Sequence, residues 1–277
     1  MNQDLIVNPE ELANSADFLT KANIASLAPS VFATKPSDEV SDKYTHIPTE
    51  RVIDDMELLG WKPIEAKQVK ARKKSTQGFQ KHLLVFRNND IVINGEDGDT
   101  VYPQILLTNS HDGKNSFQFQ AGLYRLICSN GLVIADEKFE DVKMRHMGYT
   151  FEDLQVKIKD MVERLPLTVE SMNKMKEMQL TEEEILAFAR EAINTRFSKK
   201  EMNRIEVDYE LLTQPVRKED RGNDLWSVFN VVQEKIVTGD FDYRAGGKAR
   251  KAREIKNFKQ DMRINKELFE VALTYAN

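Results

Sequence analysis

The side chains with the clearest potential for chemistry in this chain of 277 residues are His82, His111, Asp112 and His146. Histidine titrates near neutral pH and is a frequent metal ligand, and a neighbouring carboxylate could act as an acid, a base or a further ligand. No two histidines stand four residues apart, and no CxxC or HxH motif occurs. A metal-dependent nucleic-acid enzyme therefore requires the fold to bring these side chains together.

A structural role explains the same residues, and we favour it. Asp112-Gly113 is a turn signal between two apolar runs, because Asp-Gly tolerates the positive φ of tight hairpins. His111 and Asp112 would then hydrogen-bond the turn, and the single cysteine, Cys128, would fill a small core site. On this interpretation the chain has no catalytic residue, holds no metal and uses no cofactor.

Sequence motifs for other reactions are missing. There is no GxxxxGK[ST] phosphate loop, no GxSxG nucleophile elbow and no GxGxxG after a predicted strand. Nucleotide hydrolysis and serine hydrolase chemistry therefore have no support. Carboxylates that a nuclease could use lie near the predicted sheet but form no signature: Asp99, Asp112, Asp136, Glu137 and Glu140.

Two clusters of lysine and arginine form the second set of candidate residues. We predict that they contact nucleic-acid phosphates: Lys70, Arg72, Lys73 and Lys74 in the first cluster, and Lys248, Arg250, Lys251, Arg253 and Lys256 in the second. The second cluster lies in residues 244–266, where nine basic and two acidic residues give a net charge of +7, whereas the whole chain carries −5. The charge is therefore strongly segregated.

Each basic cluster also has a structural explanation. Lysines protect an edge strand from mispairing, and we expect the first cluster, with Lys67, to form a cationic row on a strand. The second could be a solvated basic helix that pairs with acidic residues such as those of 181–191. We interpret Gly246-Gly247 as a hinge before a basic helix that becomes ordered on contact with phosphates.

The fold must position these residues, and the composition favours a soluble globular chain, 40% hydrophobic and 31% charged. A single cysteine excludes an internal disulfide and fits a reducing compartment. The start of the chain lacks the pattern of a secretory signal, and no run of about 18 apolar residues could span a membrane. We therefore expect a cytoplasmic protein with no membrane partner.

The apolar patterns predict an α+β fold with three parts. Residues 1–44 form an N-terminal arm. Residues 45–150 form a domain with a short helix from Thr49 to a Gly60 cap, a mainly antiparallel sheet, and a short buried helix that carries Leu123, Leu126 and Ile127. Aromatic residues there could stack on bases: Phe79, Phe117, Phe119 and Tyr124.

Residues 151–277 are predicted to be helical and to end in the basic arm 244–266. Apolar residues recur at 3.6-residue spacing in several segments, among them residues 206–213. Thr181 and Glu184 form a capping box, and Pro166 and Pro215 are expected to interrupt the run. This region either continues the domain of residues 45–150 or stands apart from it.

A series of motifs resembles a known family. KHLLVFR, LLTNSHDG, AGLYRLICSNGLV and RHMG match in order and spacing, preceded by TERVIDDMELLGWKPIEAKQVKAR and followed by LWSVFNVVQEKIVTGDF, GGKARKAREIKNF and INKELFEVA. The chain resembles domain-of-unknown-function family 932 over residues 44–275. The resemblance implies a protein of phages, plasmids or prophages, in nucleic-acid metabolism or in counter-defence, and it supplies no catalytic residues.

Three functional hypotheses follow. The first is a non-enzymatic protein that binds DNA or RNA, single-stranded in form, and that is an oligomer related to single-strand annealing or recombination; its outline is similar to phage annealing proteins, by fold-level analogy alone. The second is a counter-defence or host-takeover protein that binds a host protein. The third is the metal-dependent nucleic-acid enzyme that uses the histidines.

Overall fold

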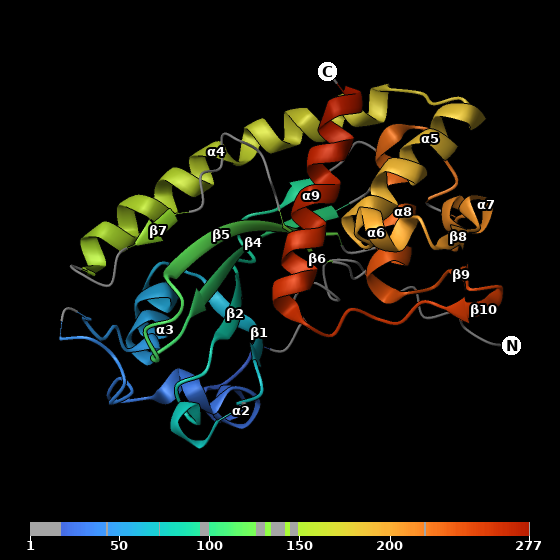
Figure 1. Ribbon diagram of the computed structural model, residues 1–277. Coiled ribbons are helices and arrows are strands. Elements are labelled where there is room, and N and C mark those ends of the chain that lie inside the picture. The colour runs from blue at the N-terminus through green and yellow to red at the C-terminus, as the bar shows by residue number, and fades with distance from the viewer. Residues whose placement is uncertain are drawn as a thin grey trace, which may run out of the picture. The chain divides into compact units, whose positions relative to one another are not determined.

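The computed structural model describes residues 18–42, 44–71, 73–94, 100–125, 131–133, 142–144, 149–218 and 220–276. The fold is α+β with antiparallel sheets, as predicted (Figure 1). The chain forms two compact units: the N-terminal unit comprises Met1–Leu126 and Glu140–Val162, and the C-terminal unit comprises Ile127–Phe139 and Glu163–Asn277. Across the described ranges, no helix has both the length and the apolar character needed to cross a bilayer.

The N-terminal unit is built on an antiparallel sheet. Its main strands lie side by side in the order β1 (Lys62–Gln68), β2 (His82–Arg87), β4 (Thr100–Asn109) and β5 (Phe117–Arg125). Two short strands extend it, β3 (Ile93–Asn94) beside β4 and β7 (Val142–Met144) beside β5. The predicted Asp-Gly hairpin joins β4 to β5, with Gly113 at φ 72°.

Helices α2 (Lys21–Leu27) and α3 (Thr49–Leu58) pack against β1. The prediction for α3 is confirmed: it begins at Thr49, buries Val52, Ile53 and Met56, and is followed by Gly60 at φ 83°. Within this packing every residue of β2 is buried. The core of this unit therefore lies where β2 crosses the middle of the sheet.

The short helix predicted after Gly122 is wrong for residues 123–125, the part of it that the structure describes. Leu123 and the two residues after it continue β5 and pair with β4 as far as Val101 opposite Arg125. The partner strand β4 provides hydrogen-bond partners for the backbone of this segment, and strand pairing therefore prevails over the local helical pattern. Residues 126–130, which include Cys128, lie outside the described residues.

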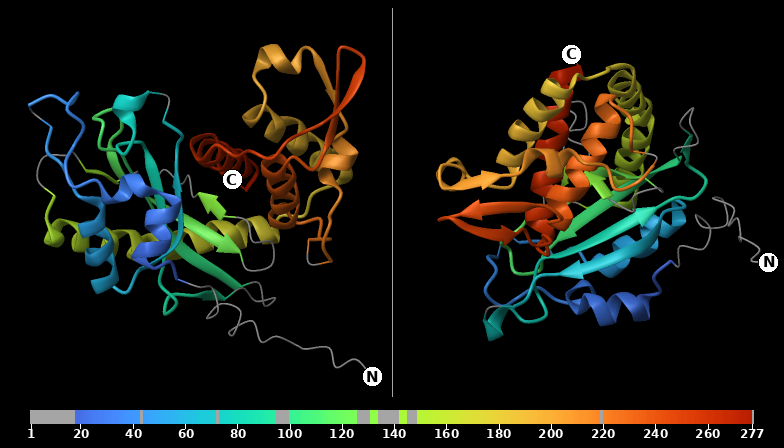
Figure 2. Two further views of the ribbon diagram at one scale, coloured as in Figure 1. Left: turned by 90° about the horizontal axis from the view of Figure 1, so that it is seen from below. Right: turned by 90° about the vertical axis from the view of Figure 1, so that its right-hand side faces the viewer.

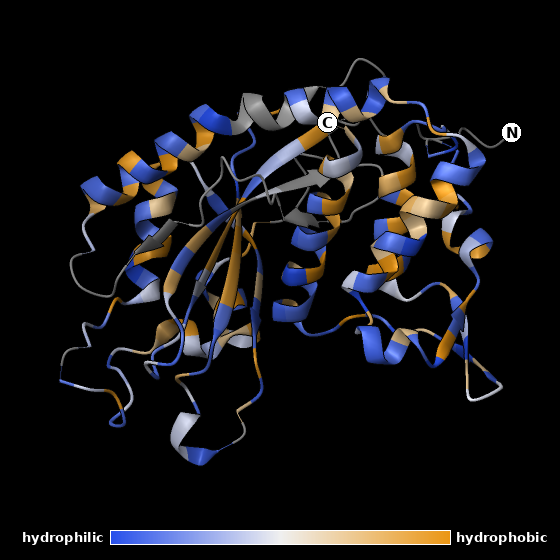
Figure 3. Cartoon of the chain, turned by 45° about the horizontal axis from the view of Figure 1, so that its top comes forward, coloured by the Kyte–Doolittle hydropathy of each residue, from blue (hydrophilic) through white to orange (hydrophobic). Residues whose placement is uncertain are grey.

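Helices dominate the C-terminal half. They are α4 (Phe151–Glu177), which the two units share, then α5 (Glu182–Ala192), α6 (Lys199–Met202), α7 (Tyr209–Thr213), α8 (Leu225–Thr238) and α9 (Phe258–Ala276). The capping box of α5 is confirmed, since the Thr181 hydroxyl and the Glu184 carboxylate each bind the other's backbone N–H. Hydrophobic and hydrophilic bands alternate along α9, as in an amphipathic helix (Figure 3).

Pro166 does not interrupt the helical run, because it lies inside the continuous helix α4. A proline inside a helix removes one backbone hydrogen bond. Buried apolar residues on both sides of it, such as Ile158 and Met172, favour one long helix despite that loss.

The C-terminal unit also contains a small antiparallel sheet that the sequence pattern did not predict. Its order is β10 (Lys248–Lys251), β9 (Asp242–Ala245) and β8 (Ile205–Val207). The predicted helix over residues 206–213 is wrong at its start, because residues 206 and 207 belong to β8, and the predicted hinge before a basic helix is wrong too. Gly246 and Gly247 form the turn of the β9–β10 hairpin, with φ of 58° and 75°, and α9 begins only at Phe258.

Two successive residues with positive φ suit the tight turn of a hairpin, so Gly246 and Gly247 favour a strand on either side of them. The hairpin projects beyond the helices of its unit (Figure 2).

Candidate nucleic-acid interface

A hollow of about 660 Å³ opens on the C-terminal unit beside the β9–β10 hairpin. Its lining consists of Arg196, Phe197, Tyr243, Arg250, Lys251, Ala252 and Arg253. Four of these residues are cationic, two are aromatic and none is acidic. Three of the cations, Arg250, Lys251 and Arg253, belong to the C-terminal basic cluster that the sequence predicts to bind phosphates.

The hairpin register determines which side chains share a face. Arg250 on β10 pairs directly with Tyr243 on β9, and Lys248 pairs with Ala245. Directly paired residues in an antiparallel ladder project from the same side of the sheet, and neighbours along a strand alternate. Tyr243, Lys248 and Arg250 therefore share one face, and Lys251 lies on the other.

Three aromatic rings form the floor of this region. The centroids of Phe197 and Tyr243 lie 5.4 Å apart, and the Phe241 ring lies 6.4 Å from the first and 6.5 Å from the second. Phe241 is 1% exposed, whereas Phe197 and Tyr243 are half-buried and reach the hollow. Phe241 thus supports two rings that remain accessible.

Arg196 holds the parts of the hollow together. Its guanidinium donates to the carbonyl oxygens of Ile236 in α8 and Arg253 in the connector, the segment 252–257 between β10 and α9. It also lies 5.2 Å from the Phe241 ring centroid. Burial lowers the pKa of Arg196, but an arginine starts so far above neutrality that it stays charged. Because both terminal nitrogens of Arg196 donate to backbone carbonyls, we assign this side chain a structural role and not a role in ligand binding.

The connector is tied to the end of α8 by backbone contacts. Ala252 N–H donates to Phe241 O at 3.0 Å, and Ile255 N–H donates to Val237 O at 2.9 Å. Gly239, at φ 78°, is the C-cap residue of α8, and its Cα lies close to the backbone of Arg253. These contacts fix the backbone that carries Arg253.

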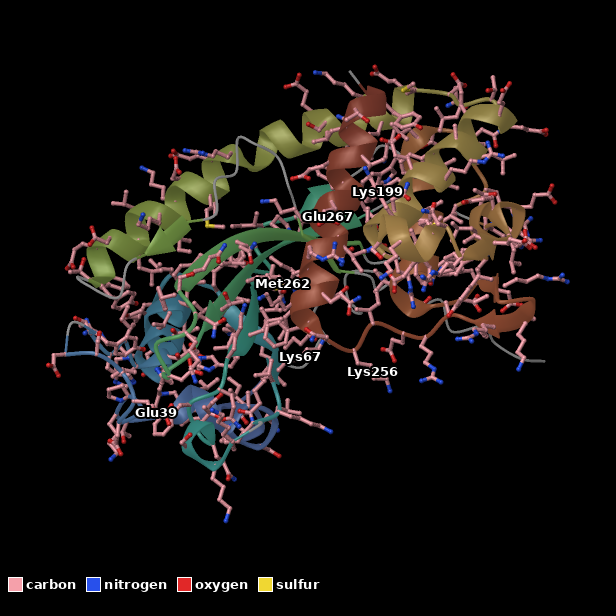
Figure 4. The ribbon with its side chains drawn as sticks, in the orientation of Figure 1. Glu39, Lys67, Lys199, Lys256, Met262 and Glu267 are labelled. Carbon is pink, nitrogen blue, oxygen red and sulfur yellow. The ribbon has the colours of Figure 1, made fainter. Side chains whose placement is uncertain are left out.

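Few acids oppose the cations of this cluster. Lys251 pairs with Asp240 at 3.0 Å, which raises the pKa of Lys251, and Lys256 lies 4.0 Å from Glu254. No ion pair within the described ranges involves Lys248, Arg250 or Arg253. All of these side chains are exposed, and Lys256 extends from the connector (Figure 4). Their charge is therefore accessible to an anionic ligand.

The first basic cluster lies in the N-terminal unit, and its predicted strand is wrong. β1 ends at Gln68, so Lys70, Lys73 and Lys74 occupy the loop and the 3-10 turn η2 (Lys74–Thr76) that lead to β2. The strand stops because the pairing of β1 with β2 ends at Gln68 opposite His82. All three lysines are exposed, and Arg72 lies outside the described residues. Lys67 alone of the predicted row stands on β1, and its ammonium pairs with Glu65.

The aromatic residues predicted to stack on bases are mostly unsuitable. Phe117 and Phe119 are fully buried, Phe79 is half-buried, and the Tyr124 side chain is outside the described part of the chain. Phe197 and Tyr243 were not predicted from the sequence. A signal existed for Tyr243: reading Gly246-Gly247 as a hairpin turn would have placed it opposite Arg250.

Two of the histidine candidates do come together, in the core of the N-terminal unit. The rings of His82 and His111 lie 5.2 Å apart, and His46, which was not among the predicted residues, lies 4.6 Å from His111. His82 and His111 are both 0% exposed. Asp112 points instead into the β4–β5 turn and accepts hydrogen bonds from Ser110 Oγ and Lys114 N–H. His146 lies outside the described residues.

The His82 ring belongs to a buried hydrogen-bond network. Nδ1 lies 3.1 Å from both the Gln80 carbonyl oxygen and Ser30 Oγ, and Nε2 lies 2.9 Å from Thr49 Oγ1. Because a carbonyl can only accept, Nδ1 carries the proton and Nε2 accepts from Thr49. Burial lowers the pKa of His82 to about 4, so the ring is neutral at pH 7. Across the described ranges, no group of three or more His, Cys, Asp or Glu side chains could hold a metal ion.

Comparisons with known proteins agree with the motif series. The chain is 29% identical over 255 residues to "UPF0380 protein YafZ" of Escherichia coli (strain K12), which covers 92% of this chain and 90% of that protein. It is 28% identical over 257 residues to "UPF0380 protein YfjQ" of the same organism, which covers 92% and 91%. No solved structure matches. The family described as "Domain of unknown function (DUF932)" matches residues 36–269, and the chain therefore belongs to that family.

Proposed function

We propose that this chain is a phage or mobile-element protein that binds nucleic acid without catalysing a reaction. Its C-terminal basic cluster would contact the phosphate backbone, and the exposed loop lysines Lys70, Lys73 and Lys74 would add a second set of contacts. A role in strand annealing or recombination is consistent with binding of this kind.

One observation carries the proposal, which is the composition of the hollow beside the β9–β10 hairpin. Four of its seven lining residues are cationic and none is acidic, in a chain whose net charge is −5. A cationic patch on an acidic protein favours a local anionic ligand, and phosphate is the ligand that arginine binds through two nitrogens at once.

The proposal predicts a specific dependence on salt. Each phosphate that a cation neutralises releases counterions, so the logarithm of the binding constant falls with the logarithm of salt concentration by about 0.7 per neutralised phosphate on a single strand. Two or three neutralised phosphates at the hollow would give a slope of roughly −1.4 to −2.1. Affinity would vary little with base sequence, since phosphate contacts carry no sequence information.

Fluorescence anisotropy of a labelled oligonucleotide across a salt series tests this. Lys248→Ala combined with Arg250→Ala should weaken binding and reduce the slope by about 1.4. The matched control combines Lys174→Ala with Lys218→Ala, which removes the same charge from exposed positions of the same unit that do not line the hollow. Absence of binding at low salt, or an affinity indifferent to salt, would refute the proposal.

A further inference from the structure

We infer that the ligand of the hollow is single-stranded, and that one unpaired base stacks on Tyr243, beside the tilted ring of Phe197, while Arg250 and Arg253 contact the neighbouring phosphates. This inference rests on the proposed function and specifies its substrate class. It assigns separate tasks to the two kinds of residue in the hollow, since rings bind a base and cations bind the backbone.

Two aromatic rings of the hollow are accessible to a ligand. Phe197 and Tyr243 are only half-buried and line the hollow, although the neighbouring Phe241 is buried. In a duplex each base is already stacked on its neighbours, so its flat face is not available to a protein ring. An unpaired base has a free face, and stacking on it shields the aromatic surface from water.

The two rings are held in position before any ligand binds. Tyr243 stands on the central strand of its sheet, paired with Val207 on β8 and with Arg250 on β10. The Phe197 N–H donates to Ile193 O at 3.1 Å, and its ring packs on Tyr243. A platform fixed in this way loses little conformational freedom on binding, so the ordering cost falls mainly on the nucleic acid.

Two cations of the hollow lie close to these rings. Arg250 lies directly across the ladder from Tyr243, where paired Cβ atoms stand about 5 Å apart. Arg253 lines the same hollow on a backbone that Arg196 and the end of α8 hold in place. The hollow, at about 660 Å³, falls in the range of roughly 300–1,000 Å³ typical of small-molecule sites, so it can receive a nucleotide.

A tryptophan at position 243 tests the stacking directly. The two native tryptophans, Trp61 and Trp226, are 2% and 3% exposed, so a nucleic acid bound at the surface should not contact them. Tyr243→Trp fluorescence should be quenched by an unlabelled single-stranded oligonucleotide, in step with anisotropy. The control is Tyr209→Trp, a half-exposed ring in the same unit that lies against Arg190 and does not line the hollow, and its emission should not change.

Affinity measurements complete the test. Tyr243→Leu should weaken binding of the single strand by about 5- to 150-fold, the loss that removal of one stacked base causes, and should leave duplex binding unchanged. Tyr243→Phe keeps the ring and should bind as the parent does. If the far-UV circular dichroism shows that Tyr243→Leu is unfolded, its affinity is not informative. The quenching of Tyr243→Trp and the affinity of Tyr243→Phe then test the stacking.

The two proposals fail in different ways. Salt-dependent binding that is equal for single strands and duplexes, without quenching at position 243, would overturn this inference and leave the proposed function intact. Absence of any nucleic-acid binding would overturn both. Equal quenching by an acidic peptide would show that the hollow recognises negative charge without bases, and would also overturn the inference.

Discussion

Gly239 lies so close to Arg253 that a Cβ on the glycine would stand 2.4 Å from the carbonyl carbon of Arg253 and 2.8 Å from its Cα. The same glycine has a φ of 78°, which L side chains rarely adopt. The end of α8 and the connector can therefore approach only because this position lacks a side chain. The contact ties the backbone that presents Arg253 to the core of the C-terminal unit.

Gly239→Ala should accordingly destabilise the protein and displace Arg253. The positive φ alone costs about 1–2 kcal/mol, and the clash with backbone atoms adds to it. Urea denaturation measures the free energy of unfolding. The control is Gly247→Ala. Gly247 has a similar φ of 75° but no atom within 4 Å of an added Cβ, so this variant should lose only the free energy that the positive φ costs. Equal losses in the two variants would contradict the close approach.

His82 should make the N-terminal unit sensitive to mild acid. Its pKa in the folded state is about 4, whereas the unfolded value is 6.5, so between these values the unfolded chain binds a proton that the native chain does not. Stability should be constant above about pH 6.5 and fall as the pH drops toward 4, by on the order of 3 kcal/mol in total.

The free energy of unfolding at several pH values checks this, with His82→Gln as the comparison. Glutamine does not titrate, so the difference between parent and variant should shrink as the pH falls through this range. The variant should be less stable at pH 7, because it disturbs the contacts with Ser30 and Thr49. A difference that is constant from about pH 7.5 to about pH 4.5 would show that His82 is not the responsible group.

The loop after β1 should contribute to binding of long single strands. The combination Lys70→Ala, Lys73→Ala and Lys74→Ala should lower the affinity and reduce the salt slope by up to about 2, at about 0.7 for each phosphate that the variant no longer neutralises. Anisotropy over a salt series measures both quantities. The combination Lys35→Ala, Lys62→Ala and Lys67→Ala removes the same charge from exposed positions of the same unit. If the two combinations behave alike, net charge and not the loop determines affinity.

The capping box of α5 should have a measurable effect on stability. Thr181→Ala removes the acceptor for the Glu184 N–H and the hydroxyl that donates to the Glu184 carboxylate at 2.8 Å. The expected loss is about 1 kcal/mol of unfolding free energy. Thr181→Ser keeps the hydroxyl and should retain most of the stability, so a serine variant as unstable as the alanine variant would argue against the cap.

Features encoded within a few residues could be predicted from the sequence alone. The start of α3, the Gly60 that follows it, the Asp112-Gly113 hairpin and the Thr181 capping box depend on local spacing and on the φ that each residue tolerates. The charge segregation of residues 244–266 is also a property of the sequence itself, as are the motifs that identify the family.

The tertiary structure decided which distant residues meet. The pattern around Leu123 predicts a helix, but in the fold this residue pairs with β4. The pattern of residues 244–266 predicts a helical basic arm, but in the fold β10 pairs with β9. Phe197 and Tyr243 are 46 positions apart, and no local rule joins them. His46, His82 and His111 likewise meet only because strands and loops from separate parts of the chain bury them together.

The physical reason is that propensity, capping and turn chemistry act over about one turn of chain, whereas strand pairing and burial depend on partners far along it. The sequence by itself determined that this protein carries a concentrated positive charge near its C-terminus. Only the folded chain placed that charge beside two half-buried aromatic rings that line the hollow, because the hairpin register sets Arg250 opposite Tyr243.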